Sequence, residues 1–445
     1  MSTELNWAGN HTYRADRLAY PRSTAELQEL VASAPKLRAL GSRHSFNDLA
    51  DSTGTLVSLE KLDPGISIDE TARTVSVSGG TRYGVLAEEL QRRGYALHNL
   101  ASLPHISVAG AVATATHGSG DANGNLATAV VGMDLVLASG EIRSVRRSST
   151  ADFDGMVVGL GALGIVSRLI LRIEPAFGVR QDVFTDIPWA TVLEDFDAAT
   201  SAAYSVSLFT DWRSDVVSQA WLKSRTDAPG LTTRFFGGTP ARAALHPLPG
   251  ISAENCTVQL GVPGPWSDRL AHFRMEFFPS SGQELQTEYL VPREYAVEAI
   301  TVMRSFGKRL GPLLQVSEIR SMAADRLWLS SSYERASIGL HLTWKPEQAA
   351  VEALLPELEA ALAPLSARPH WGKLFAAEVE ALEPLYPRFS DFRELAERMD
   401  PEHKFRNDFL ERKVFGRASR PGALDSPAVS ASGRATASVP GSGAG

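Results

Sequence analysis

Cysteine is almost absent from this chain of 445 residues, in which Cys256 is the only one. One thiol can form neither an internal disulfide nor a zinc site made of several cysteines, and it suits a reducing compartment. No run of apolar residues is long enough to cross a bilayer, and the opening MSTELNWAGN lacks the basic and apolar regions of a secretory signal. We therefore expect a cytoplasmic protein that does not engage a membrane.

A surplus of positive charge is also missing, because 44 Lys and Arg residues stand against 51 Asp and Glu residues, for a net charge of -7. This balance supports solubility and gives no reason to expect a nucleic-acid partner. Apolar residues make up 44% and charged residues 21%, as in ordinary globular proteins. The length is sufficient for two domains, each with its own core, and we expect a monomer.

Helices and strands alternate in the first third of the chain. Ser23 and Glu26 form a capping box ahead of an apolar helical face. Strands are expected at 37–40 and around 75–77, a helix at 85–93 closed by Gly94, and a hairpin formed by 131–137 and 142–145.

The middle of the chain has a different pattern. Strands are expected at 285–291, 314–320 and 338–344, with helices at 295–308 and 347–362, as in an α+β domain built on an antiparallel sheet. From Arg417 onward the chain is almost entirely Ala, Ser, Gly, Pro and Arg, so we expect a disordered tail that cannot bury enough apolar surface to fold.

The residues from Gly159 to Gly164 match the G-x-G-x-x-G pattern of dinucleotide-binding proteins. That pattern binds a dinucleotide only between a strand and a helix. Here the apolar residues of segment 165–173 favour a strand, and no acidic residue follows at the end of a second strand. We therefore reject a Rossmann NAD site and interpret the glycines as a turn, where the backbone can still approach a cofactor closely.

The turn from Gly41 to Phe46 follows a predicted strand and contains His44. A glycine turn at the end of a strand exposes backbone N–H groups, which can hold a pyrophosphate. His44 is then either a ligand or nucleophile, or an ordinary loop histidine. Taken alone, the turn favours the ordinary histidine.

Small residues and hydroxyl groups are concentrated between Ala101 and Gly120. Small side chains allow the backbone to lie against a bulky cofactor, and Ser and Thr hydroxyls bind phosphate oxygens. A tightly packed buried helix is the alternative. The density of hydroxyls and the Gly-Ser-Gly ending favour a phosphate cradle.

Two of the predicted strands carry polar faces. Alternation places Glu318 and Arg320 on one face of their strand, and His341 and Thr343 on one face of another. Such a face usually points to solvent, and for either strand alone we favour that interpretation. Together, two faces of mixed donors and acceptors can instead line a site for a ligand rich in hydroxyls. Lys373 is a third candidate cation, although by itself it is typical of a surface lysine.

These segments together resemble the vanillyl-alcohol-oxidase-type FAD oxidoreductases, and among them the alditol (xylitol) oxidases. The resemblance runs from Asn6 to about Phe415. The motifs typical of the superfamily are GSRHSFN at 41–47, ASLPHISVAG at 101–110, ATHGSG at 115–120 and GALGIV at 161–166. Those distinctive of alditol oxidases are AAYSVSLFTDWR at 202–213, GVPGPW at 261–266, EYLVPRE at 288–294, EIR at 318–320 and RPHWGK at 368–373.

The resemblance implies an α+β fold of two domains, of the vanillyl-alcohol-oxidase (PCMH) type. Residues 1–175, with a C-terminal return at 375–416, would bind FAD. Residues 176–374 would form an antiparallel-sheet domain that holds the substrate over the flavin ring, and 417–445 would remain the disordered tail.

The resemblance also implies roles for individual residues. The family's histidine at the position of His44 bonds covalently to the flavin 8α-methyl group. No metal is expected, and the implied FAD contacts are Gly41, Ser42, Arg43, His44, Ser45, Phe46, Asn47, Ser102, Ser107, Gly110, Thr114, Ala115, Thr116, His117 and Val166. The implied polyol contacts are Ser102, Glu318, Arg320, His341, Thr343 and Lys373, with Arg320 and Lys373 as the catalytic pair. Relatives of this kind have glycine at the position of Arg43, so this chain departs from them beside the linking histidine.

The implied reaction is oxidation of the terminal CH–OH of an alditol such as xylitol or sorbitol to the aldose, with dioxygen as acceptor and hydrogen peroxide as product. Arg320 and Lys373 would favour the developing alkoxide, and Glu318 would accept substrate hydroxyls and orient Arg320. The acceptor of the hydroxyl proton stays open, because arginine is too basic for that role. Ala101 is small at a position that can govern oxygen access in this superfamily, which favours an oxidase.

Three alternatives differ in class or substrate. The nearest is a sugar-1,4-lactone oxidase or dehydrogenase of the same superfamily. A metal hydrolase using His44, His105 and His117 is a second, but their spacing fits no compact metal motif. A sugar-binding module without chemistry is the third, and it predicts no change of absorbance when polyol is added.

Overall fold

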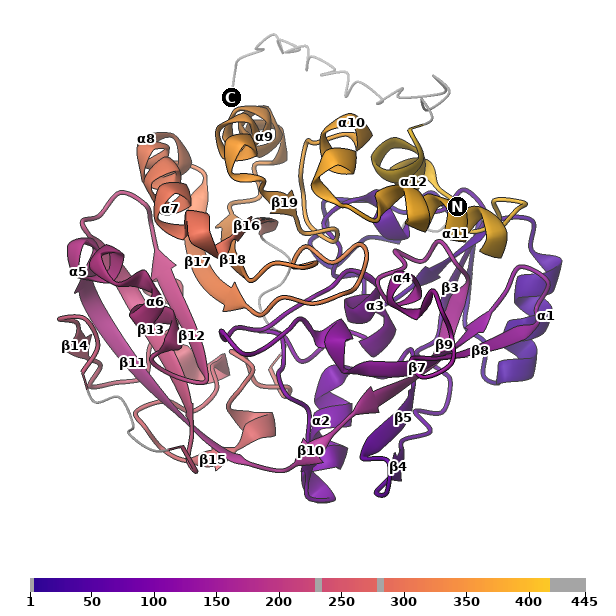
Figure 1. Cartoon of the computed structure of the whole chain (residues 1–445), viewed down its shortest axis with the longest axis horizontal. Coiled ribbons are helices and arrows are strands. Elements are labelled where there is room, and N and C mark those ends of the chain that lie inside the picture. The colour runs from indigo at the N-terminus through magenta and orange to yellow at the C-terminus, as the bar shows by residue number, and fades with distance from the viewer. Residues whose placement is uncertain (1–3, 229–233, 278–283, 417–445) are drawn as a thin grey trace, which may run out of the picture.

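The computed structural model describes residues 4–228, 234–277 and 284–416 of the chain. The predicted disordered tail at 417–445 lies outside the described residues. Figure 1 shows the described elements in two halves, with one large sheet in one half and several small sheets in the other.

Two small sheets form most of the first half. A parallel sheet has the order β1–β3–β2, and an antiparallel sheet has the order β4–β5–β9–β7–β8. A third sheet consists of β6 (Tyr95–Ala96) paired with β10 (Glu174–Pro175). The other strands are β1 (Arg17–Ala19), β2 (Leu37–Leu40), β3 (Thr55–Ser58), β4 (Ser67–Asp69), β5 (Thr74–Ser78), β7 (Val130–Val136), β8 (Ile142–Arg146) and β9 (Ile165–Arg172). The helices are α1 (Thr24–Ser33), α2 (Tyr83–Arg92), α3 (Val108–Ala113) and α4 (Phe153–Val157).

Local expectations in this half are confirmed. Ser23 caps α1, and its hydroxyl accepts a hydrogen bond from the backbone N–H of Glu26 at 3.1 Å. α2 ends just before Gly94, which has a left-handed φ of 79°. The glycine pattern at 159–164 leads into β9, a strand, so the segment does not form a Rossmann turn.

One large antiparallel sheet forms the second half, in the order β14–β11–β13–β12–β17–β18–β16–β19, with β15 paired to β11. Its strands are β11 (Gly178–Pro188), β12 (Ser205–Thr210), β13 (Val216–Arg225), β14 (Thr239–Pro240), β15 (Gly264–Pro265), β16 (Leu285–Pro292), β17 (Leu314–Met322), β18 (Ser337–Trp344) and β19 (Arg368–Pro369). The helices of this half are α5 (Trp189–Glu194), α6 (Phe196–Ser201), α7 (Ala296–Ser305), α8 (Gly307–Leu310) and α9 (Gln348–Leu362).

The three strands expected in this region are confirmed as β16, β17 and β18, and the second expected helix is α9. The first expected helix, at 295–308, is instead divided into α7 and α8. The division lies beside Gly307, which packs so closely on the chain that an added Cβ would lie 2.4 Å from the carbonyl oxygen of Trp212.

The C-terminal segment returns to the first half through α10 (Val379–Leu382), α11 (Phe389–Met399) and α12 (Asp408–Leu410). Lys404 anchors this return. Its buried ammonium donates to the carbonyls of Val31 at 2.8 Å, Ala32 at 3.3 Å and Ala138 at 2.7 Å. Because two of these carbonyls lie in the last turn of α1, Lys404 also satisfies the open end of that helix.

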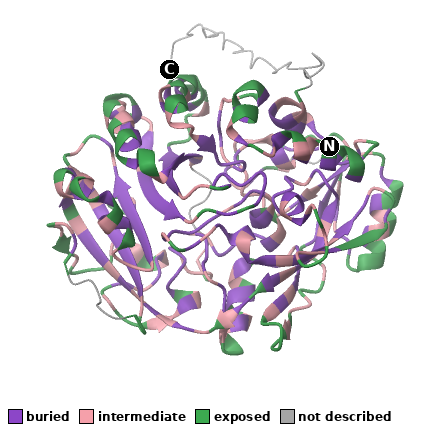
Figure 2. Cartoon of the chain, in the orientation of Figure 1, coloured by how far each residue is buried: buried purple, intermediate pink, exposed green. Residues whose placement is uncertain are grey.

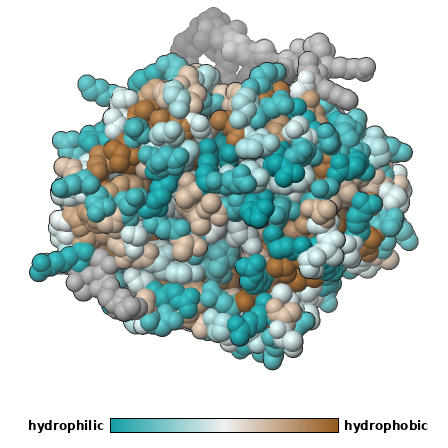
Figure 3. Space-filling view, in the orientation of Figure 1, coloured by the Kyte–Doolittle hydropathy of each residue, from teal (hydrophilic) through white to brown (hydrophobic). Residues whose placement is uncertain are grey.

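The strands form the buried centre of both halves, and exposed positions follow the outer faces of the helices (Figure 2). The face in Figure 3 is mostly hydrophilic, with apolar residues in small scattered groups. None of the helices in the described ranges is both long and apolar enough to span a membrane.

Candidate active site

A cavity of about 590 Å³ lies between the small sheets and the large sheet. One part of its wall comes from the turn Gly41–Phe46, α3 and the glycine turn at 159–164. The other part comes from the polar face of β16, β17 and β18 and from the loop that carries Lys373. The cavity therefore joins the segments that the sequence assigns to cofactor and to substrate.

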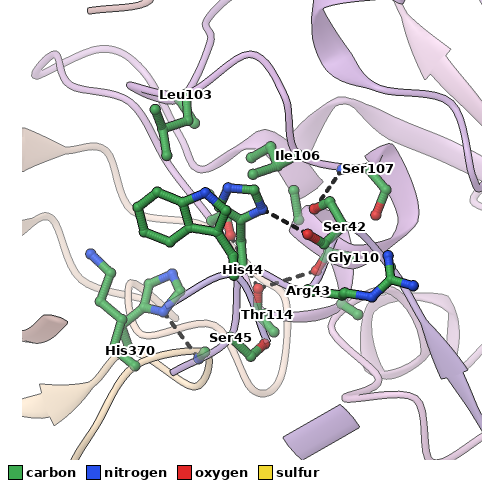
Figure 4. Close-up of a pocket in the computed structure, with 18 of the residues that line it drawn as sticks. Ser42, Arg43, His44, Ser45, Leu103, Ile106, Ser107, Gly110, Thr114 and His370 are labelled. Atoms are coloured by element: carbon green, nitrogen blue, oxygen red, sulfur yellow. Dashed lines mark hydrogen bonds between the residues drawn. The ribbon is translucent and has the colours of Figure 1, made fainter. Parts of the chain in front are cut away.

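His44 projects into this cavity from the turn between β2 and η1 (Asp48–Ala50) (Figure 4). Its Nδ1 lies 2.9 Å from the carbonyl oxygen of Ser42, which can only accept, so Nδ1 carries the proton. Its Nε2 is buried and has no hydrogen-bond partner among the described residues. Burial lowers the pKa of His44 to about 4, so the imidazole is neutral at neutral pH. The interpretation of His44 as an ordinary loop histidine is therefore disfavoured.

Trp7 stacks on His44, with ring centroids 5.0 Å apart and planes inclined by 18°. Arg43 ties Trp7 to the turn. The Arg43 carbonyl accepts from the Trp7 N–H at 2.9 Å, and the Arg43 guanidinium pairs with Glu4 at 2.7 Å. Arg43 adopts a left-handed φ of 64°, which costs a residue other than glycine about 1–2 kcal/mol. In this chain the strained position carries a side chain that fastens the N-terminal segment over the histidine.

Ser107 lies at the centre of the cradle that the small residues form. A Cβ added at Gly41 or at Gly110 would lie 2.6 or 2.7 Å from the Ser107 Oγ, so a side chain at either position would force the Ser107 hydroxyl to move. The Ser107 Oγ is buried and has no hydrogen-bond partner in the described part of the chain. A buried hydroxyl without a partner is costly, so a hydroxyl and an imidazole that both face this cavity fit a polar ligand such as a flavin nucleotide.

The cavity wall includes nearly all of the predicted cofactor residues. They are Gly41, Ser42, Arg43, His44, Ser45, Phe46, Ser102, Ser107, Gly110, Thr114, Thr116, His117 and Val166. Asn47 and Ala115 are not among the lining residues. The Asn47 amide instead donates to the carbonyls of Trp371 and Lys373, at 2.9 and 2.7 Å, and so joins the His44 turn to the lysine loop.

The polar strand faces meet in one row of the large sheet. His341 of β18 pairs with Glu318 of β17 on one side and with Glu288 of β16 on the other. All three side chains are buried and line the cavity. The interpretation of these faces as solvent-exposed sheet surface is therefore wrong, because these buried residues form part of the cavity wall.

Lys373 is not a surface lysine, since only 12% of its side chain is exposed. Its Nζ lies 2.6 Å from the Glu288 Oε2 and 2.7 Å from the His341 Nδ1. An ammonium group has three N–H bonds, so one direction remains for a ligand. Burial lowers the pKa of Lys373 below its ordinary value.

Glu288 is a site residue that the sequence analysis missed. Its buried carboxylate accepts from the Arg320 Nη2 at 2.7 Å and from Lys373, and it lies 3.3 Å from the His117 Nε2. Burial alone would raise the pKa of Glu288, but Arg320 and Lys373 hold it well below its ordinary value. The two cations therefore face the cavity with a shared counter-ion.

Glu288 also changes the role expected of Glu318. Glu318 was expected to orient Arg320, but its Oε2 lies 3.7 Å from the Arg320 Nε, and Arg320 donates its direct hydrogen bond to Glu288. Glu318 is held instead by His272, whose Nε2 lies 2.8 Å from its Oε1. His272 was not predicted either, because a lone histidine in a loop carries no periodic signal.

Two family models match the chain. The first, described as an FAD binding domain, matches residues 15–146, and the second, described as D-arabinono-1,4-lactone oxidase, matches residues 278–413. An alditol oxidase of a Streptomyces species is 48% identical over 94% of this chain and 100% of its own length. An L-gulono-1,4-lactone dehydrogenase of Mycobacterium tuberculosis is 28% identical over 92% of this chain and 98% of its own.

Solved structures of cholesterol oxidases share the fold. One from B. sterolicum has a TM-score of 0.71 at 14% identity and covers 92% of this chain and 96% of its own. Another, a solvent-stable cholesterol oxidase, has a TM-score of 0.72 at 16% identity, with the same coverage. The expected α+β FAD-binding fold is thereby confirmed. Given the identity to the Streptomyces enzyme over its whole length, the chain belongs to the alditol oxidases of the vanillyl-alcohol-oxidase-type family, and its cofactor is FAD.

Proposed function

We propose that this enzyme oxidises the terminal CH–OH of an alditol such as xylitol or sorbitol to the aldose, with dioxygen as acceptor and hydrogen peroxide as product. The observation that carries the proposal is the buried row of Glu288, His341 and Glu318, beside Arg320 and Lys373 in the wall of the cofactor cavity. Hydroxyl groups can both donate and accept, so a row that lines the cavity with carboxylates, an imidazole and two cations suits a ligand with a hydroxyl on each successive carbon.

In this proposal one half of the fold binds the cofactor and the other binds most of the substrate. Residues 1–175 and 375–416 hold FAD, and residues 176–374 hold the polyol. Glu318, His341 and Thr343 bind hydroxyls along β17 and β18, and Ser102 binds one from the opposite wall. The Arg320 Nη1 lies 3.4 Å from the Ser102 Oγ, which supports a shared position for the reacting end of the substrate.

Arg320 and Lys373 bind the oxygen that is oxidised and stabilise its developing negative charge. The residues of the first half that line the cavity would hold FAD, which would supply the acceptor for the hydride of the terminal carbon. Lys373 acts as an ammonium group that donates to Glu288 and His341, and Glu288 and Glu318 outweigh burial and raise the pKa of Arg320, so neither cation takes the hydroxyl proton, which leaves to solvent. Glu288 holds both cations and fixes where their free N–H groups point.

The test is a substrate panel on the purified holoenzyme. Xylitol and sorbitol are expected to bleach the flavin absorbance without air and to release hydrogen peroxide in air. L-Gulono-1,4-lactone and D-arabinono-1,4-lactone are expected to do neither at equal concentration. Faster bleaching by a lactone would replace the proposal with the lactone reaction, and bleaching by polyol without peroxide in air would make the enzyme a dehydrogenase.

A covalent bond between His44 and the flavin 8α-methyl group is part of the proposal. The neutral, buried imidazole supports it, because an unprotonated ring nitrogen is a nucleophile. After denaturation in acid, the wild-type pellet is expected to stay yellow, and the His44→Ala pellet to be colourless with free FAD in solution. A colourless wild-type pellet would remove the bond, and a yellow His44→Ala pellet would move it to another residue.

We also propose that the enzyme is a cytoplasmic monomer. Light scattering after gel filtration tests the oligomeric state.

The small Ala101 lines the cavity and supports the choice of dioxygen as acceptor. Ala101→Val is the direct test of that choice, since a larger side chain is expected to slow reoxidation by dioxygen more than reduction by polyol.

A further inference from the structure

Behind Glu318 lies another buried lysine, Lys223 of β13, which is 1% exposed. Its Nζ lies 2.6 Å from the carbonyl oxygen of Leu270, 2.8 Å from that of Ala271 and 3.1 Å from the Nδ1 of His272. An ammonium group has three N–H bonds and no lone pair. These three acceptors therefore use all of its donors.

The contact with Lys223 decides which nitrogen of His272 carries the proton. Because the ammonium can only donate, the His272 Nδ1 accepts and the proton is on Nε2. That Nε2–H then donates to the Glu318 Oε1 at 2.8 Å. The Oε1 of Glu318 therefore accepts a hydrogen bond from His272, and its Oε2 remains for a ligand in the cavity.

The same segment also supports the opposite wall of the site. The backbone N–H groups of His272 and Phe273 donate to the carbonyl of Ser102 at 3.1 and 3.2 Å. Residues 270–273 therefore contact two of the residues that are proposed to bind the polyol, Ser102 and Glu318. Both the His272 and the Phe273 side chains line the cavity.

From these contacts we infer that Lys223 and His272 are positioning residues for the polyol, and that they hold the Glu318 carboxylate in the orientation that binds substrate hydroxyls. This inference rests on the proposed polyol oxidation. Neither side chain takes part in the redox step, so their loss is expected to act on KM more than on kcat.

The charged and titratable groups around the imidazole determine the pH at which this arrangement changes. Lys223 faces His272 from β13, Glu318 and Arg320 face it from β17, His341 lies beyond Glu318 on β18, and the Cys256 thiol lies near Lys223. Burial and Lys223 lower the pKa of His272 to about 4. Burial lowers the pKa of Lys223 to about 7, so the contact is complete below that pH and weakens above it.

The first test compares two replacements of His272 in the holoenzyme. Glutamine can still donate to Glu318 and accept from Lys223, whereas leucine fills a similar space with neither ability. We expect His272→Leu to raise the KM for xylitol about tenfold, and His272→Gln to stay within about threefold of wild type, since leucine loses the two hydrogen bonds to Glu318 and Lys223 that glutamine keeps. Equal KM values for the two variants would show that His272 acts only through packing and would overturn the inference.

The second test uses pH and a matched control. Wild type is expected to show a KM for xylitol that rises above about pH 7, as Lys223 loses its proton. Lys223→Met is expected to show a high KM without that rise. Lys404→Met removes another buried lysine that donates to three carbonyls, remote from the cavity, and is expected to keep the wild-type profile. A rise that persists in Lys223→Met would overturn the inference.

A third measurement does not depend on turnover. Nitrogen-15 NMR of the histidine rings in the wild-type holoenzyme, with the His272 signals assigned by their loss in His272→Gln, reports the tautomer directly. A neutral ring with its proton on Nε2 is expected at pH 6, where Lys223 is protonated. A ring with its proton on Nδ1, or a charged ring at pH 6, would overturn the inference. If no polyol reduces the wild-type flavin, the proposed function fails, and this spectrum still decides the state of His272.

Discussion

At the residue scale, the chemistry of the site depends on how two buried cations are kept together. Arg320 and Lys373 are both buried, and in the low dielectric of the interior they would repel each other strongly if no anion lay between them. Glu288 lies between them and contacts both. The net charge of the pair is thereby reduced, while each cation keeps a free N–H direction toward the cavity.

Replacing Glu288 with glutamine is expected to reduce both catalysis and stability. The amide cannot neutralise either cation, and removing one partner from a buried ion network costs about 3–5 kcal/mol. We expect kcat/KM for xylitol to fall about a hundredfold or more, and the melting temperature to drop. Glu357→Gln is the matched control, because it removes a carboxylate from an exposed pair with Arg309, and it is expected to change neither value.

The pH dependence of stability in the same variant has a definite sign. The pKa of Glu288 is lower in the folded chain than in the unfolded chain, so its contribution is present above the ordinary glutamate pKa of about 4.3 and is lost as the pH falls. The stability difference between wild type and Glu288→Gln, followed by denaturant titration, is expected to shrink below about pH 4.5. A difference that stayed constant down to pH 3 would contradict the assigned ion network.

Glu288 could have been found from the sequence. The alternation that selected Glu318 with Arg320, and His341 with Thr343, also places Gln286 and Glu288 on one face of the predicted strand at 285–291. Lys223 carries no such signal, because its face of β13 mixes the polar Gln219 and Arg225 with the apolar Val217 and Trp221.

At the element scale, the site is created by the order of three strands. Residues 288, 318 and 341 meet because β18 pairs with both β16 and β17. Alternation predicts which side chains share a face of one strand, but it does not determine which strand becomes the neighbour, since that depends on packing between segments far apart in the chain. The sequence therefore predicted the polar faces, and the row they form required the structure.

Gly339 shows how closely these strands converge. It pairs with Arg320, and a Cβ at Gly339 would lie 3.0 Å from the Glu288 Oε1 and 3.4 Å from the Met322 Cε. Gly339→Ala is expected to displace the Glu288 carboxylate by a few tenths of an ångström and to lower kcat about tenfold in xylitol assays, because such catalysis depends on position at that scale.

The control for Gly339→Ala lies on the other face of the same strand. Ile338→Val removes one buried methylene on the apolar side of β18 and is expected to cost about 1 kcal/mol of stability. Its kcat is expected to match wild type. If both variants lose kcat equally, the strand tolerates no substitution and the close approach at Gly339 has no special role.

At the scale of the whole molecule, the cavity exists because the chain returns to its beginning. The lysine loop follows β19 and meets the His44 turn, where the Phe46 N–H donates to the Gly372 carbonyl at 2.9 Å. Composition and periodicity alone could not predict this closure, because it joins residues more than three hundred positions apart. The resemblance to a known family supplied that expectation, and it did so through motifs at both ends of the chain.

The closure can be weakened without touching the site. Lys404 fastens the C-terminal return to α1 and to the β7–β8 turn through three carbonyls, and it is buried away from the cavity wall. Methionine at this position would fill a similar volume but leave those carbonyls without their donor, at a cost of about 3 kcal/mol. We expect Lys404→Met to lower the melting temperature by several degrees and to shorten the half-life of activity on heating, with kcat and KM for xylitol unchanged at 25 °C. A change in KM with no loss of thermal stability would mean that the return positions the substrate-binding residues directly, and that the two halves of the fold are coupled through the cavity.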